Sequence, residues 1–228
     1  SWNQAGTGAS AVRARAGGNP AFSDVLVAKP TGKGESQQLT LQIDKPFQGG
    51  AWSWMASYTF THATDVGPLG SANSASLWGG RTSFDPNANI SGRSIYEIKD
   101  RFTAALNWQH NFFGDYATMA SLFYEGRSGR PYSYVYDNDA NGDGVAGNDL
   151  LYIPSGPGDV VFGSQAEEAA FFVMVDGDPY LRMHRGSVVT RNGARAGWVN
   201  QFDLRLHQEL PGFAAGHKSQ LWLDVLNV

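Results

Sequence analysis

The sequence predicts an all-β protein: a fragment of an antiparallel transmembrane β-barrel, with about six long strands in three hairpins and long extracellular loops, one of them containing a short helix. Two observations carry this prediction. Long stretches alternate residue by residue between apolar and polar side chains. Short turns and long polar connections also follow one another regularly along the chain.

Composition favours strands over helices. The chain of 228 residues has 28 glycines and 13% aromatic residues, which suits strands joined by turns. It contains 17 basic and 21 acidic residues with no block of Lys or Arg, so nucleic acid is not an expected partner. The absence of cysteine excludes disulfides, thiolate metal sites and cysteine nucleophiles.

A helical membrane protein is excluded by hydropathy. No apolar run approaches the roughly 18 residues of a membrane helix, and the longest covers residues 169–175. Membrane strands are compatible with the mean hydropathy of -0.32, because their alternating pattern averages apolar with polar residues.

The first predicted hairpin follows a Gly/Ala/Ser-rich loop over residues 1–36. Its strands cover residues 38–47 and 52–64, with a short turn at 48–50 between them. The second strand has the cleanest alternation in the chain. One of its faces carries Trp52, Trp54, Ala56, Tyr58, Phe60 and His62.

The second predicted hairpin follows a polar loop over residues 65–97. It extends from Ile98 to Tyr136 around a tight turn at residues 113–116. The third hairpin combines a strand over 198–210 with one over 218–228.

The loop over residues 137–197 is expected to contain the short helix. Ser164 and Glu167 form a capping box before an apolar run, which predicts a helix from about Gln165 to Met174. Its apolar residues Phe171, Phe172 and Val175 are expected to pack within the loop.

The regular difference between short and long connections indicates an outer-membrane barrel, which has short periplasmic turns and long external loops. A soluble sandwich has no reason to keep this difference. Aromatic residues near the three short turns fit an interfacial girdle. They are Phe47, Trp52, Trp54, Trp108, Phe112, Phe113, Tyr116 and Phe213.

The strand over residues 198–210 suggests which face meets lipid. An arginine on the lipid face at mid-bilayer would cost roughly 2 to 4 kcal/mol, so the charged face is expected to line the lumen. A soluble sheet with one wet face would alternate in the same way. The predicted lumen-facing residues are Asp44, Arg101, Glu125, Arg127, Asp203 and Arg205, and the predicted lipid-facing residues are Phe102, Leu106, Trp108, Phe202, Leu204 and Leu206.

Several stretches carry a family resemblance: residues 39–47, 124–132, 148–154, 191–192, 198–208 and 224–228. From about Phe22 onward the chain resembles the barrel of Oar-like TonB-dependent receptors of Gram-negative outer membranes. The resemblance implies a 22-stranded barrel with an N-terminal plug, which moves a large substrate using energy from the inner membrane.

Neither a plug nor an energy-coupling box is found in this sequence, and six strands cannot close a barrel, since the smallest have about eight. Residues 1–228 are therefore expected to be the C-terminal part of one outer-membrane barrel domain. The expected partners are outer-membrane lipid, a large substrate, and a TonB-type energy-coupling system acting through the missing plug. The expected location is the bacterial outer membrane.

One acidic stretch resembles the start of a calcium loop. Asp139, Asn141 and Asp143 alternate before Gly144, as calcium ligands do in a D-x-[DN]-x-[DN]-G loop. Leu150 occupies the twelfth position, where a bidentate glutamate normally closes the site, and only Asp149 beside it offers a substitute. Two interpretations stay open at this point: a calcium site and a plain acidic, glycine-rich turn. No other cofactor is expected.

Catalysis has no local support in the sequence. Neither an H-E-x-x-H motif nor a G-x-S-x-G elbow is present, so an enzyme is not expected, and the charged residues of the predicted lumen face are expected to form ion pairs. Transport is the leading functional hypothesis. The alternative is a soluble or surface all-β binding module, adhesin-like or lectin-like, with a calcium loop.

Overall fold

The computed structural model describes residues 2–5, 12–15, 26–68, 70–214 and 216–228. The chain divides into two compact units. Residues 36–62, 98–129 and 196–228 form a sheet unit, and residues 1–35, 63–97 and 130–195 form a loop unit.

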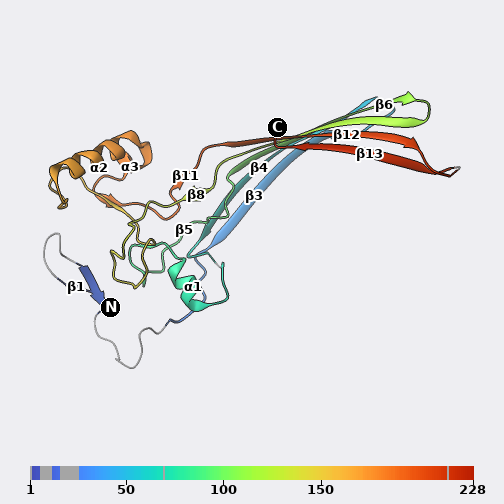
Figure 1. The fold of residues 1–228 in the computed structure, drawn as a ribbon. Helices are drawn as coiled ribbons and strands as arrows, with labels where there is room; N and C mark the ends of the chain where they lie inside the picture. The colour runs from blue at the N-terminus through green and yellow to red at the C-terminus, as the bar shows by residue number, and fades with distance from the viewer. Residues whose placement is uncertain (1, 6–11, 16–25, 69, 215) are drawn as a thin grey trace. The chain divides into compact units, whose positions relative to one another are not determined.

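Six long strands build the sheet unit and confirm the predicted all-β fold of three hairpins (Figure 1). They are β3 (Glu35–Lys45), β4 (Trp52–Asp65), β6 (Asp100–Phe113), β7 (Tyr116–Arg127), β12 (Val199–Pro211) and β13 (Lys218–Leu226). Their order across the sheet is β13-β12-β7-β6-β4-β3. Every pair from β4 to β13 is antiparallel.

The short turns all lie at one end of these strands, and the long connections start and end at the other. Each short turn contains a glycine with positive φ: Gly49 at 75°, Gly114 at 64° and Gly216 at 81°. Glycine adopts this conformation without a steric penalty, which explains the composition of the turns. The strands have 9 to 14 residues, and about 9 to 11 suffice for a tilted strand to cross a bilayer.

Within the described residues the sheet stays open, with β3 and β13 as its two edges. No described helix has the length and the apolar character needed to cross a membrane.

One predicted strand end is wrong. The second strand of the middle hairpin was expected to reach Tyr136, but β7 ends at Arg127. Residues 131 and 132 form a separate short strand, β8 (Pro131–Tyr132). Gly129 lies between β7 and β8. Its backbone passes so close to the backbone of Ala196 and Gly197 that a Cβ atom on residue 129 would collide with it.

The loop unit contains more secondary structure than the expected long loops. Its described residues form three helices, α1 (Ser74–Gly79), α2 (Gln165–Gly177) and α3 (Pro179–Met183), of which only α2 was predicted. Its short strands are β1 (Trp2–Ala5), β2 (Val12–Arg15), β5 (Gly92–Arg93), β8, β9 (Tyr152–Ile153), β10 (Ser187–Val188) and β11 (Ala194–Arg195). The pairs are β1 with β2, β9 with β10 and β8 with β11, while β5 pairs with Thr64 and Asp65 at the end of β4.

Helix α2 begins as its sequence predicts. The side chain of Ser164 accepts a hydrogen bond from the backbone N–H of Glu167 at 3.2 Å, which satisfies one of the free donors at a helix start. Asp178 then caps α3 by accepting from Tyr180 N at 2.7 Å, and Pro179 follows it as the first residue of α3. Proline has no N–H to continue α2, so the chain turns here.

The core of the loop unit is small. Its buried members are Leu150, Ile153, Val175, Leu181 and Val189. Phe171 packs against them, and Phe172 contacts Phe162 and Arg185. The predicted packing role of the apolar residues of α2 is therefore confirmed.

We expect Gly129→Ala to destabilise the sheet unit, because the added Cβ would meet the backbone of Ala196 and Gly197 rather than a flexible side chain. Forcing extra volume into a tight site costs typically about 1 to 3 kcal/mol. The urea midpoint of unfolding in detergent, followed by tryptophan fluorescence, should fall. Gly50→Ala is the control, since nothing lies within 4 Å of a Cβ there. Equal urea midpoints for the two variants would contradict the close backbone approach at Gly129.

Candidate functional site: two sheet faces and an acidic loop

The pairing register gives the sheet one apolar face. Directly paired residues share a face, so one row runs across five strands through Trp54, Leu106, Leu122, Leu204 and Val225. The next row towards the turns continues this face through Trp52, Trp108, Ala120, Leu206 and Leu223. Phe102 and Phe202 belong to the same face. All six residues predicted to meet lipid therefore share one face.

Aromatic rings gather at both ends of the apolar face. Near the turns, the ring centroids of Trp52 and Trp108 are 6.4 Å apart, and those of His110 and Phe112 are 4.5 Å apart. At the opposite end, the paired rings are Tyr58 with Phe102 at 4.7 Å, Phe102 with Trp198 at 6.0 Å, and Tyr124 with Phe202 at 4.8 Å. Sequence reasoning found only the group near the turns, because the second group comes together only once the register is known.

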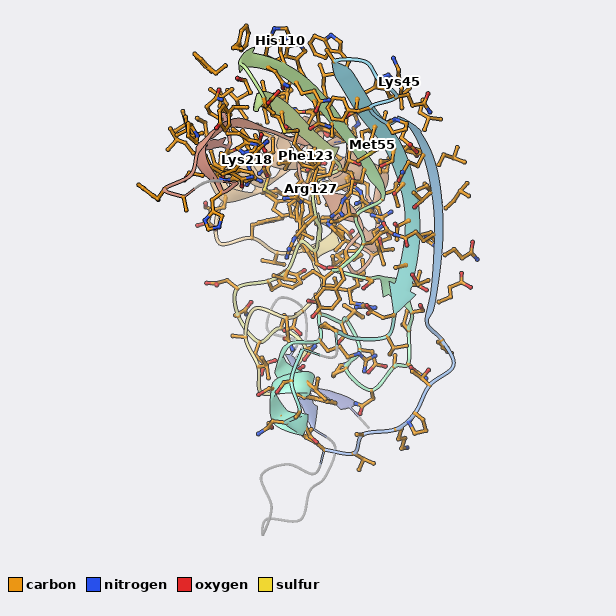
Figure 2. All side chains as sticks on the ribbon, turned by 90° about the vertical axis from the view of Figure 1, so that its right-hand side faces the viewer. Lys45, Met55, His110, Phe123, Arg127 and Lys218 are labelled. Atoms are coloured by element: carbon orange, nitrogen blue, oxygen red, sulfur yellow. The ribbon has the colours of Figure 1, made fainter. Side chains whose placement is uncertain are left out.

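The opposite face carries the charges. Glu125 lies 3.4 Å from Arg101 and 3.3 Å from Arg127. Arg205 donates two hydrogen bonds to the carboxylate of Asp224, at 2.6 and 2.9 Å. In Figure 2, His110 and Arg127 mark the two ends of the β6–β7 hairpin.

Two predicted lumen-facing carboxylates have other surroundings. Asp203 accepts from the backbone N–H of Asn227 at 2.9 Å and from the Gln201 side chain at 3.2 Å, and no ion pair of Asp203 is found among the described residues. Asp44 lies in β3, on the same face as Thr40 by strand alternation. The Thr40 hydroxyl oxygen is 3.0 Å from that of Thr59, whose partner across the ladder is Arg101. The structure therefore places all six predicted lumen-facing residues on one face.

This charged face also has an apolar row. Met55 pairs with Ala105, Ala105 with Phe123, and Phe123 with Asp203. Figure 2 labels Met55 and Phe123. No local sequence pattern singles out this row, although its residues alternate with those of the apolar face along each strand.

A buried ion network holds segments of the loop unit together. Glu97 is 2% exposed and pairs with Arg93, at 3.2 Å, and with Arg195. Its second oxygen accepts from the backbone N–H of Ala63 at 2.8 Å. Three segments distant in sequence thus meet at one carboxylate.

A second contact joins the same segments. Arg191 donates to the Asp65 carboxylate at 2.7 Å. Asn192, in a left-handed conformation with φ 54°, donates from its side chain to Arg93 O at 2.8 Å. Sequence reasoning had noticed residues 191 and 192 only as part of a resemblance.

The acidic loop brings the four predicted metal-ligating residues together. Carboxylate oxygens of Asp139, Asp143 and Asp149 all lie within 4.8 Å of one another. Asn141 is 4% exposed, and its backbone N–H donates to Asp149 Oδ2 at 3.2 Å. Burial raises the pKa of Asp149, opposed by the N–H groups of Asn141 and Ala140 and assisted by the neighbouring carboxylates. The loop therefore concentrates negative charge in a buried place.

The two faces and the alternating long and short connections define the class of protein. The sheet is of the antiparallel kind that forms the wall of a membrane barrel. A family model described as outer membrane beta barrel domain matches residues 1–228. The chain belongs to this family, and the protein is located in the bacterial outer membrane. No match was found among curated proteins or among solved structures.

We expect Glu97→Gln to loosen the loop unit. The change leaves the guanidinium groups of Arg93 and Arg195 around a neutral amide, and removing one partner of a buried ion pair costs on the order of 3 kcal/mol. Limited proteolysis of the folded protein should cut within residues 63–97 and 130–195 at least tenfold faster.

Glu167→Gln is the matched control, because Glu167 is exposed and glutamine serves equally well at this position of a capping box. If both variants are cut at the wild-type rate, Glu97 does not hold these segments together.

Proposed function

We propose that this chain forms part of the barrel wall of a TonB-dependent transporter that moves a large substrate across the outer membrane. The observation that supports this most directly is the separation of the sheet into an apolar face and an ion-paired face by the pairing register of the strands, which is interrupted in the β6–β7 ladder between His110 and Phe113, near the turn. In this proposal the apolar face meets lipid and the other face lines the lumen.

The lipid assignment follows from energy and from geometry. Turning the charged face to lipid would place Arg101, Arg127 and Arg205 in or near the bilayer, at up to roughly 2 to 4 kcal/mol each. Phe102 and Trp108, from the two aromatic groups, are six residues apart in β6, or about 20 Å along a strand at roughly 3.4 Å per residue. Two girdles flanking an apolar band about 25 Å tall are typical of outer-membrane barrels.

The open edges support a larger barrel. In lipid, every unpaired backbone N–H or C=O costs several kcal/mol, so β3 and β13 need neighbouring strands from elsewhere. A barrel with the 22 strands implied by the resemblance would supply them.

The apolar row on the inner face supports a plug. Met55 and Phe123 gain nothing from a lumen filled with water, whereas a folded domain inside the barrel would cover them. An N-terminal plug of the Oar-like type has this position, and it would connect the barrel to the TonB-type energy-coupling system.

The loop unit is assigned to the cell exterior, because the hairpin turns at the other end of the strands are short, as periplasmic turns are. There it would make first contact with the large substrate. We propose neither an enzymatic role nor nucleic-acid binding.

A surface binding module is the second candidate, favoured by the acidic loop and by the folded character of the loop unit. It differs from the transporter in needing no coupling to the inner membrane.

Coupling therefore separates the two candidates. A photo-crosslinker in the periplasmic domain of the TonB-type protein should capture the full-length receptor in energised cells. The yield should drop several-fold when the proton gradient is collapsed. A TonB-type variant that cannot bind plugs serves as the control, and a full yield with that variant, or no capture in any condition, would argue for the binding module.

Single cysteines test the face assignment, since the chain has none of its own. A fluorophore on a cysteine replacing Leu204 or Leu206 should be quenched several-fold more by brominated lipid than one replacing Asp203 or Arg205. A water-soluble thiol reagent should show the reverse preference in native membranes. Stronger lipid quenching at 203 and 205 would invert the assignment, because a shift of one residue exchanges the faces.

A further inference from the structure

The acidic loop carries an inference that does not depend on the transport proposal. Three carboxylates, from Asp139, Asp143 and Asp149, converge at one place, and two of them are buried, with Asp143 and Asp149 each 2% exposed. Burying like charges together is costly unless a cation joins them.

An unpartnered oxygen points to that cation. Asp149 Oδ2 accepts from the backbone N–H groups of Ala140 and Asn141, at 2.6 and 3.2 Å. Asp149 Oδ1 is buried, and no group in the described residues donates to it. A buried acceptor left without a partner costs about 1 to 3 kcal/mol, and more when it is charged.

Asn148 supplies a second such oxygen. The residue is 3% exposed, and its Nδ2 donates to Asp143 Oδ2 at 3.1 Å, which holds its amide at the carboxylate cluster. Its Oδ1 is buried and has no donor among the described residues. Asp149 Oδ1 and Asn148 Oδ1 therefore both have lone pairs that a bound cation could accept.

We propose that Asp139, Asn141, Asp143 and Asp149 bind one calcium ion, with Asn148 beside them as a further oxygen donor. All the donors are oxygens, which selects a hard cation over zinc or copper.

The set of donors favours calcium over magnesium. Magnesium usually keeps several waters and is held by one or two carboxylates, whereas calcium takes 6 to 8 oxygen ligands from carboxylates and amide or backbone carbonyls. Three carboxylates whose oxygens lie within 4.8 Å of one another, with amide oxygens beside them, fit the larger ion.

The structure also explains how the loop closes without a glutamate at its twelfth position. Leu150, which occupies that position, is buried in the hydrophobic core. The preceding residue, Asp149, instead joins the carboxylate cluster. Gly144, with φ 87°, provides the sharp turn that a calcium loop needs at its sixth position.

Ion binding at this loop would stabilise two connections at once. The backbone around Asp149 is bonded to the segment that contains Ser83: Ser83 N donates to Asn148 O at 2.9 Å, and Leu150 N donates to Ser83 O at 3.2 Å. Tyr136 N donates to Asp149 O at 2.9 Å. Calcium would thus order residues near Ser83 as well as the loop itself.

The test is calorimetric titration of the purified full-length protein in detergent with calcium chloride, after removal of divalent ions by a chelator. We expect a dissociation constant of about 10⁻⁴ to 10⁻³ M, the range of extracellular calcium modules. Asp149→Asn, which keeps the shape and one acceptor oxygen, should weaken binding at least tenfold.

Asp137→Asn is the matched control, because Asp137 is exposed and lies outside the cluster in the same loop. It should leave the affinity within about twofold. No calcium-dependent heat in the wild type, or equal affinity in Asp149→Asn and wild type, overturns the proposal.

Hydrogen exchange tests the wild type without any substitution. The amides of Ser83, Tyr136 and Leu150 should exchange at least about fivefold more slowly in 5 mM calcium chloride than in chelator, since the factor 1 + [Ca]/Kd is about 6 at the weak end of the expected range. The slowing in 5 mM magnesium chloride should be less than half as large on a logarithmic scale. Unchanged exchange rates in calcium would refute the site even if Asp149→Asn failed to fold.

Discussion

The backbone pairing register of the six long strands is the constraint on which the sheet unit depends. From β4 to β13 the ladder puts Trp54, Leu106, Leu122, Leu204 and Val225 in one row. Side chains alternate with a period of two, so a slip of one residue in any ladder would exchange the two faces of a whole strand. Ion pairs such as that of Arg205 with Asp224 join neighbouring strands across the charged face and favour the same register.

The loop unit is stabilised differently. In its described part the buried apolar cluster has five members, so charged and polar contacts carry much of its organisation. Glu97 joins Arg93 and Arg195 in one place, and the acidic loop is bonded through its backbone to the segment around Ser83. Both features satisfy buried polar groups between segments that have little apolar surface to share. A polar interior of this kind suits a unit built from connections rather than from regular strands.

Sequence reasoning succeeded where one local rule decides the outcome. Alternation predicted the strands and separated Leu204 from Arg205, and the capping box predicted the start of α2 at Gln165. It failed where distant segments decide. Just past the end of β7, the backbone of Gly129 lies close to Ala196 and Gly197, and the network at Glu97 likewise joins residues that no local pattern connects. The position of Asp149 depends on Leu150 entering the core, which the spacing of ligands does not reveal.

The contact between Arg191 and Asp65 has a consequence for the order in which the chain folds, because 126 positions separate the two residues. Closing a loop of that length costs conformational entropy that the local hairpins do not have to overcome. Contacts between distant residues also form slowly compared with local ones. We therefore expect the hairpins to form early. The loop unit should reach its final structure last, because it also needs residues 130–195. Any factor that holds the chain during assembly would then meet formed hairpins with incomplete connections between them.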